Sequence, residues 1–153
     1  MKGPAEIFLK NLDLARQTLN FDLWAYVVMP EHVHVVLQPL DEQYEMAAIL
    51  RAIKKPVSHE IFENFPSLRD RCIVNRIEGK TPEYRFWQAG GGYDRNIETA
   101  EDAWSKIHYV HWNPVKRDLC ESQIEWPFSS ARAYAEVVGN TPIPVDLCRW
   151  GMD

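Results

Sequence analysis

Hydrophobic positions along the chain alternate between helical and strand periodicity. Residues 4–19 place apolar side chains on one side and charges on the other, which predicts an amphipathic helix. Residues 21–29 are rich in β-branched and aromatic residues and predict a strand. Residues 32–39 predict a second strand that Pro39 ends, and the short turn between the two strands predicts a hairpin.

Three further segments complete the middle of the chain. Residues 42–64 predict a long helix, and Pro56 inside it predicts a break or kink. Residues 65–83 are mixed in character and rich in loop signals. Residues 84–97 read as strand-like material that three glycines interrupt, so this segment can supply a further strand.

A last helix is predicted over residues 100–113. Thr99 can cap its N-terminus, and Asp102 three residues later forms an acidic variant of the capping box. The Asn113–Pro114 pair should end or kink this helix, because the residue before a proline disfavours the helical conformation.

This layout predicts an α+β fold, with a small antiparallel sheet covered by helices. A hairpin alone is not stable, so further strands must join it. Residues 84–97 can provide one strand, whereas no segment clearly provides a fourth. We expect a single domain over residues 1–153, with residues 121–153 as a C-terminal tail.

Composition and cysteine content narrow the class of protein. The apolar runs are too short to cross a bilayer and the N-terminus mixes charges, so no membrane association and a cytoplasmic location are expected. The three cysteines, Cys72, Cys120 and Cys148, are widely spaced and form no CxxC pair, which argues against disulfides and a structural zinc site.

The charge distribution bears on nucleic acid as a partner. The net charge of -5 argues against such a partner for the chain as a whole. Residues 51–95, however, carry nine basic and six acidic side chains, a local balance of +3. A local basic segment can bind phosphate even when the whole chain is acidic. Charge alone therefore leaves open whether this segment binds nucleic acid or is a solvated surface of mixed charge.

The stretch "PEHVHVV" contains two histidines two residues apart. Successive strand side chains alternate faces, so His32 and His34 share one face. The opposite face, with Val33, Val35 and Leu37, is expected to be core. Two such imidazoles can bind one metal ion, but two ligands do not make a site. The pair alone is read more simply as a turn residue and a half-buried strand residue.

The predicted last helix adds two candidate residues. Tyr109 and Asn113 are four apart and share a face that lies nearly opposite the apolar side, on which His111 is expected in the core. An exposed tyrosine can act as a nucleophile, and an asparagine one turn later can offer an oxygen ligand. The alternative is a tyrosine that covers neighbouring surface and a helix-end asparagine before proline.

Taken together, these four residues suit phosphoryl transfer to a tyrosine. A metal ion held by His32, His34 and Asn113 would polarise the scissile phosphate and offset its developing charge. Tyr109 would attack in line and form a covalent phosphotyrosine.

Four segments carry a family resemblance: "YVVMPEHVHVVLQP", "FWQAGGGYD", "HYVHWNPVK" and "EWPFSS". In this order and rough spacing they resemble the single-tyrosine HUH transposases, and most of all the REP-associated tyrosine transposases. The resemblance runs from about Asp22 to Ala133, which is most of the chain.

The resemblance implies roles for the same four residues. His32 and His34 match the metal-binding histidine motif, Asn113 the third ligand, and Tyr109 the nucleophile. It implies Mg²⁺ or Mn²⁺ as the cofactor, single-stranded DNA with a REP-like hairpin as the partner, and a 5′-phosphotyrosine intermediate. It also implies a ferredoxin-like sheet and a monomer or homodimer.

The chain departs from this family pattern in two ways. The family sheet normally opens with a strand before the first helix, and this chain starts at or just before that helix, so we expect a sheet that lacks this strand. The acidic net charge is the second departure. Both favour an alternative function, a domesticated or inactive descendant that binds single-stranded or hairpin DNA without cleavage. A metal-binding protein with another substrate is a third reading.

The basic middle segment holds the candidate DNA contacts. Trp87 and Tyr93 could also stack on unpaired bases, although core packing is the commoner role of such residues. The residues expected to meet phosphates are Arg51, Lys54, Lys55, Arg85 and Arg95.

Overall fold

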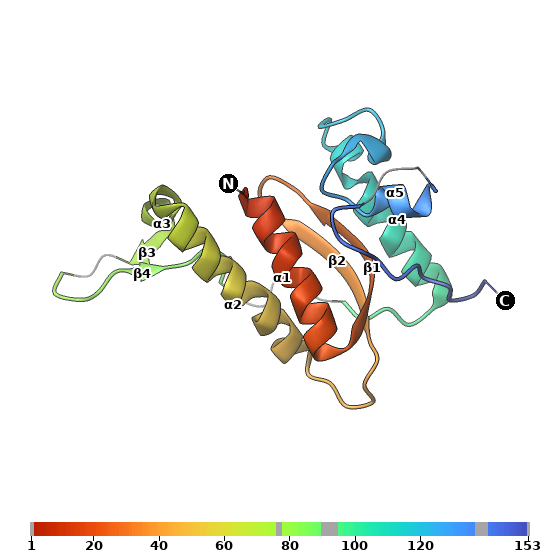
Figure 1. Ribbon diagram of the computed structural model, residues 1–153, viewed down its shortest axis with the longest axis horizontal. Coiled ribbons are helices and arrows are strands. Elements are labelled where there is room, and N and C mark those ends of the chain that lie inside the picture. The colour runs from red at the N-terminus through yellow and green to blue at the C-terminus, as the bar shows by residue number, and fades with distance from the viewer. Residues whose placement is uncertain (1, 76–77, 90–94, 137–140, 153) are drawn as a thin grey trace. The chain divides into compact units, whose positions relative to one another are not determined.

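The structure, a computed structural model, describes residues 2–75, 78–89, 95–136 and 141–152. These residues include helices and antiparallel strands joined by turns and loops, which confirms the α+β class (Figure 1). None of the described helices is long and apolar enough to cross a bilayer. The elements are α1 (Pro4–Leu19), β1 (Phe21–Val28), β2 (Val33–Pro39), α2 (Met46–Asn64), α3 (Pro66–Arg71), β3 (Ile73–Asn75), β4 (Glu83–Tyr84), α4 (Ala100–Lys116), the 3₁₀ turn η1 (Gln123–Glu125) and α5 (Ala131–Tyr134).

The chain divides into two compact units, each built from two separate stretches of sequence. Unit 1 comprises residues 1–15 and 44–95, and unit 2 comprises residues 16–43 and 96–153. Helix α1 therefore begins in unit 1 and ends in unit 2. The assignment of residues 1–153 to a single domain stays a prediction.

In unit 1, α2 runs as one helix through Pro56, so a break at this proline is wrong, while the alternative of a kink stays a prediction. Pro56 is exposed, while the apolar side chains of α2 recur every four residues and are buried. This buried stripe stabilises the helix on both sides of the hydrogen bond that proline cannot make. The buried residues are Ile49, Ile53, Val57 and Ile61.

Residues 84–97 do not supply a third strand to the predicted hairpin in the part of this segment that the structure describes. Tyr84 belongs to β4, which pairs with β3 in a separate two-stranded sheet. Phe86 and Trp87 pack ring edge to ring face, and the Trp87 indole N–H donates to the Lys54 carbonyl. The aromatic side chains that suggested a strand are thus used in ring packing. Residues 90–94, with Tyr93, lie outside the described residues.

In unit 2, β1 and β2 form the predicted antiparallel hairpin, with Val27 opposite His34 and a register shift between Leu23 and Ala25. Strand β2 begins at Val33, so His32 lies in the connecting turn. The His32 carbonyl accepts the Met29 N–H at 2.8 Å, which closes the turn and holds His32 next to the strand.

Helix α4 packs on the hairpin, beside β1 in Figure 1, and this contact decides which face of β2 is core. Val36, on the same face as His34, is buried, whereas the side chains expected as core are only half-buried. The expectation that the face opposite His34 is the core face is wrong, because α4 packs on the face that carries His34 and buries Val36 there. The residues expected as core were Val33, Val35 and Leu37, and the buried cluster comprises Trp24, Ala25, Val27, Met29, Val36, Ala103, Ile107, Val110 and Cys148.

The predicted N-terminus of α4 is confirmed, since Thr99 Oγ1 accepts the Asp102 N–H at 3.1 Å. A helix end at Asn113 is wrong, because α4 continues through Pro114 to Lys116, while the alternative of a kink at this pair stays a prediction. Pro114 is fully buried, and its packing offsets the hydrogen bond that it cannot donate. The extra turn extends α4 by three residues beyond Asn113.

Residues 121–153, expected as a tail, contribute buried residues to unit 2. Phe128 and Ser130 exchange backbone hydrogen bonds with β1: Val28 N–H donates to Phe128 O at 2.9 Å, and Ser130 N–H donates to Tyr26 O at 3.0 Å. An isolated antiparallel bridge joins Val27 to Ser129 between them. This segment therefore lies along the free edge of β1 and gives the hairpin the third partner that a stable sheet requires.

The Ser130 hydroxyl joins this segment to both β1 and α4. It accepts the Tyr26 N–H at 2.9 Å, donates to the Tyr26 carbonyl at 3.2 Å, and lies 2.7 Å from His111 Nε2. His111 is buried, as predicted. Its burial, together with the charge of His108, lowers the pKa of His111 to about 4, so this imidazole is neutral at pH 7.

Replacing Ser130 by alanine is expected to lower the free energy of unfolding by about 1–3 kcal/mol, because the buried Tyr26 N–H loses its hydroxyl acceptor. Urea denaturation followed by circular dichroism measures this change. Ser105→Ala, an exposed serine on α4, is the matched control and should change stability by less than about 0.5 kcal/mol. Equal stability of the two variants would contradict the linking role of Ser130.

Candidate functional site

His32, His34, Tyr109 and Asn113 converge on one cleft in unit 2. The cleft has a volume of about 340 Å³. The two histidines come from the β1–β2 turn and β2, and Tyr109 and Asn113 come from the last turns of α4. Two more residues, Lys116 and Arg117, complete its lining. Residues some 80 positions apart in the chain therefore meet here because α4 packs on the hairpin.

The aromatic rings in the cleft lie close together and edge to face. The His32 and His34 ring centroids are 4.8 Å apart, and those of His34 and Tyr109 are 5.5 Å apart. The His32–His34 distance follows from the turn that holds His32 next to β2, and the His34–Tyr109 distance follows from the packing of α4 on β2. His34 thus lies between the other imidazole and the phenol.

Asn113 is buried, with 5% of its surface exposed. Its Nδ2 lies 3.2 Å from His34 Nε2. Because an amide NH₂ only donates, His34 Nε2 is the unprotonated ring nitrogen in this contact. Asn113 Oδ1 is buried and has no hydrogen-bond partner among the described residues. A buried acceptor without a partner costs about 1–3 kcal/mol. A ligand that binds this oxygen would therefore stabilise the site.

His34 is held in the form that a metal ligand needs. Burial lowers the pKa of His34, and the neighbouring charges of His32 and Arg117 lower it further. A lowered pKa keeps the imidazole neutral at pH 7, with a lone pair available on one nitrogen.

The donor atoms in the cleft fit a divalent metal ion. The Asn113 Nδ2 atom lies 3.2 Å from His34 Nε2, so the amide group is next to this imidazole. Rotation of the amide by half a turn would exchange its two ends and present Oδ1 there, as a shared metal ion requires. Among the described residues, no group of three His, Cys, Asp or Glu side chains could hold a metal. An ion bound here would therefore use two imidazoles together with the Asn113 oxygen, and both kinds of donor bind divalent metal ions.

Tyr109 faces away from the core of α4, as its position in the helix predicts. Its side chain is 46% exposed, and Lys116 Nζ lies 5.6 Å from its ring centroid. Next to it, His108 and Trp112 form an exposed stacked pair with ring centroids 6.1 Å apart. The phenol is accessible from solvent at the edge of the cleft.

Three charged residues at the cleft were not predicted as site residues. Arg117 Nη1 pairs with Glu31 Oε1 at 2.9 Å, and the same carboxylate oxygen lies 3.8 Å from His32 Nδ1. Lys116 lies seven residues after Tyr109 in α4 and therefore shares its face, but it follows the predicted helix end at Asn113. A predicted helix that continued through Pro114 would have included Lys116 among the candidate site residues.

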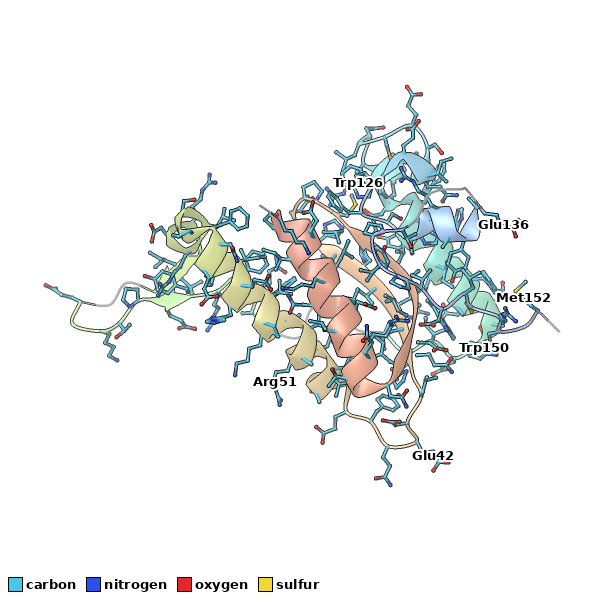
Figure 2. The ribbon with its side chains drawn as sticks, viewed as in Figure 1. Glu42, Arg51, Trp126, Glu136, Trp150 and Met152 are labelled. Atoms are coloured by element: carbon cyan, nitrogen blue, oxygen red, sulfur yellow. The ribbon has the colours of Figure 1, made fainter. Side chains whose placement is uncertain are left out.

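The predicted DNA-binding residues belong to unit 1, whereas the lining of the cleft belongs to unit 2. On α2, Arg51 projects outward (Figure 2) and Lys55 is exposed. Arg85 pairs with Glu83 through Nη2 at 2.7 Å and Nε at 2.8 Å, and so has a carboxylate partner already. The DNA-binding roles of Arg51, Lys54, Lys55, Arg85 and Arg95 stay predictions.

A larger cleft, of about 600 Å³, lies at the open end of the hairpin. Burial and the Asp146 charge raise the pKa of Asp22 there, against the lowering effect of Arg16. This cleft combines carboxylates and indoles without an imidazole or an exposed tyrosine beside them, so we assign the chemistry to the smaller cleft. The larger cleft is lined by Asp22, Trp24, Gln38, Asp146, Leu147, Arg149 and Trp150.

Comparison with known proteins identifies the family. A family model described as "Transposase IS200 like" matches residues 6–98, which is more than half of the chain. The chain belongs to the IS200-like transposase family. The matched residues of the chain include His32 and His34 and end just before α4.

Two curated relatives of the chain have bacterial sources. A REP-associated tyrosine transposase of Escherichia coli strain K12 is 26% identical over 110 residues, covering 72% of this chain and 54% of the relative. A Haemophilus influenzae protein described as "Putative REP-associated tyrosine transposase" is 25% identical over 129 residues, covering 80% of this chain and 69% of the relative. The chain thus spans about half the length of the first relative.

A solved structure also resembles the chain: a REP-associated tyrosine transposase bound to a REP hairpin. The TM-score is 0.60 at 20% sequence identity, and the match covers 95% of this chain and 76% of that chain. The likeness shows that the two proteins share a fold, in agreement with the α+β architecture.

Proposed function

We propose that the protein is a metal-dependent single-stranded DNA endonuclease and strand transferase that forms a 5′-phosphotyrosine intermediate through Tyr109. The observation that carries this proposal is the convergence of Tyr109 with His32, His34 and the unpartnered Asn113 oxygen on one cleft. The membership in the IS200-like transposase family supports it.

In the proposed reaction, the Tyr109 hydroxyl loses its proton and attacks the scissile phosphorus. A bond forms between phosphorus and the Tyr109 oxygen, and the bond between phosphorus and the 3′ oxygen breaks. The 3′ oxygen takes up a proton and leaves as a free 3′-hydroxyl. Attack of a 3′-hydroxyl on the phosphotyrosine then reverses these bond changes and transfers the strand.

The chain's own residues prepare this step. His32, His34 and Asn113 would hold Mg²⁺ or Mn²⁺, which when bound stabilises negative charge on a phosphate. Burial of Asn113 holds its amide in place, and the lowered pKa of His34 keeps a lone pair available at pH 7. The exposure of Tyr109 lets a DNA strand reach its hydroxyl.

The proposed substrate is single-stranded DNA that carries a REP-like hairpin. This part of the proposal draws on the relatives, which are REP-associated tyrosine transposases, and on the solved relative, which is bound to a REP hairpin. The oligomeric state, monomer or homodimer, is likewise a prediction.

The test is covalent capture of DNA. A hairpin-bearing single-stranded oligonucleotide labelled at its 3′ end, incubated with the protein and Mn²⁺, is expected to give a labelled protein band in a denaturing gel. The same oligonucleotide labelled at its 5′ end should instead give a shortened free product, because the protein retains the 5′ phosphate. Excess chelator should abolish both products.

Two results would contradict the proposal. Hairpin binding without any adduct in the presence of Mn²⁺ would favour a protein that binds DNA without cutting it. Adduct formation that persists in chelator would remove the metal from the mechanism, because the tyrosine would then act without charge stabilisation by the ion.

A further inference from the structure

Two cations at the end of α4 border the cleft, and neither has a role in the chemistry above. Lys116 lies in the last turn of α4, and Arg117 is the residue that ends it. Both are exposed and both line the cleft with Tyr109.

We propose that Lys116 and Arg117 form a subsite for a DNA phosphate beside Tyr109. In this proposal, Glu31 forms an ion pair with Arg117 when no DNA is bound. This inference rests on the proposed function, because it assigns a phosphodiester backbone to the same cleft. It goes further in assigning an anion site and a carboxylate that competes with the DNA for it.

Lys116 is available to bind an anion. Its Nζ lies 5.6 Å from the Tyr109 ring centroid, and within the described part of the chain the ammonium has no hydrogen-bond or ion-pair partner. A phosphate positioned for attack by Tyr109 must lie close to the phenol, and an ammonium within reach of the same ring would bind its oxygens. Lys116 therefore can hold the phosphate at the position where the tyrosine needs it.

Arg117 is held by an interaction that a phosphate can replace. Its Nη1 lies 2.9 Å from Glu31 Oε1, with side-chain exposures of 52% for Arg117 and 57% for Glu31. Ion pairs this exposed are weak, and a guanidinium binds phosphate with the same two-pronged geometry with which it binds carboxylate. A DNA phosphate at the cleft can thus displace Glu31 from Arg117 at small cost.

Glu31 has a second neighbour to which it can turn. The same carboxylate oxygen lies 3.8 Å from His32 Nδ1. Displacement by DNA therefore does not leave the carboxylate without a partner, since an imidazole N–H can donate to it. Glu31 can therefore exchange Arg117 for His32 as its partner. While it is paired with Arg117, it excludes non-specific anions from the cleft until a DNA strand is bound at other contacts.

The experiment measures binding of a fluorescent oligothymidine by anisotropy across a salt series, with chelator present so that no cleavage occurs. Glu31→Gln is expected to tighten binding several-fold and to steepen the salt dependence. Lys116→Gln and Arg117→Gln are each expected to weaken binding several-fold and to reduce the salt slope by about 0.7, the value for one single-strand phosphate contact. Arg117→Lys, which keeps the charge, should restore most of the slope.

The matched control is Glu101→Gln, which changes the net charge equally but lies exposed in the first turn of α4, far along the helix from the cleft. Equal effects of Glu31→Gln and Glu101→Gln, or unchanged slopes in both cation variants, would overturn the subsite. Absence of any oligothymidine binding by the wild-type chain at low salt would overturn it too. Altered slopes with no adduct in Mn²⁺ would uphold the subsite while refuting the proposed endonuclease.

Discussion

Replacing Tyr109 by phenylalanine is expected to reduce covalent DNA capture by at least about 1,000-fold, because the attacking oxygen is removed and another group would have to act as the nucleophile. The phenylalanine ring keeps the edge-to-face contact with His34, whose centroid lies 5.5 Å away. The expected result is therefore loss of the adduct with hairpin binding changed by no more than about twofold, within the range of a surface substitution.

A denaturing gel with 3′-labelled hairpin DNA measures the adduct, and anisotropy in chelator measures binding. Tyr44→Phe is the matched control, since Tyr44 is 54% exposed and lies in unit 1, outside the cleft. It should form the adduct at the wild-type rate. An adduct that survives in Tyr109→Phe, or a digest that maps the phosphotyrosine to a different residue, would refute the assignment of the nucleophile.

Replacing His34 by alanine is expected to weaken Mn²⁺ binding by more than about 100-fold, because even residues that only orient metal ligands contribute about 10–100-fold. His34 is the central residue of the cleft, next to the His32 ring and 3.2 Å from the Asn113 amide. Its removal takes away one of the three expected ligands and the contact that orients the Asn113 amide. Adduct formation should fall together with metal affinity.

Isothermal titration with Mn²⁺ measures the affinity without reference to DNA, and the capture gel measures the reaction. His59→Ala is the control, because His59 lies on α2 in unit 1 with a side chain that is 77% exposed. Unchanged Mn²⁺ affinity in His34→Ala would refute the metal site. A loss of adduct without a loss of metal affinity would instead assign His34 a role in positioning Tyr109.

Local sequence patterns were sufficient for several features of the fold. The hairpin followed from two apolar segments around a proline-marked turn, and the start of α4 followed from Thr99 three residues before Asp102. The outward position of Tyr109 and the burial of His111 followed from helical spacing alone. These features are local, because each depends on a few neighbouring residues and on the fixed periods of strands and helices.

Features that depend on packing between distant segments were predicted wrongly or missed. Pro56 and Pro114 are local signals for a helix break, yet burial of neighbouring apolar residues keeps both helices intact. The core face of β2 was misassigned, because only the position of α4 decides that Val36 is buried. The third partner of the hairpin comes from Phe128–Ser130, a segment without a strand pattern of its own.

The candidate site shows the same division. The sequence by itself determined which side chains could bind a metal and attack a phosphate: two imidazoles in alternation, and a tyrosine and an asparagine one helical turn apart. Only the tertiary structure decided that they share one cleft, and that the buried Asn113 oxygen has no hydrogen-bond partner among the described residues. It also decided that Lys116 and Arg117 line this cleft and that Glu31 pairs with Arg117. The physical reason is that side-chain direction is set locally by backbone periodicity, whereas the distance between β2 and α4 is set by the apolar core between them.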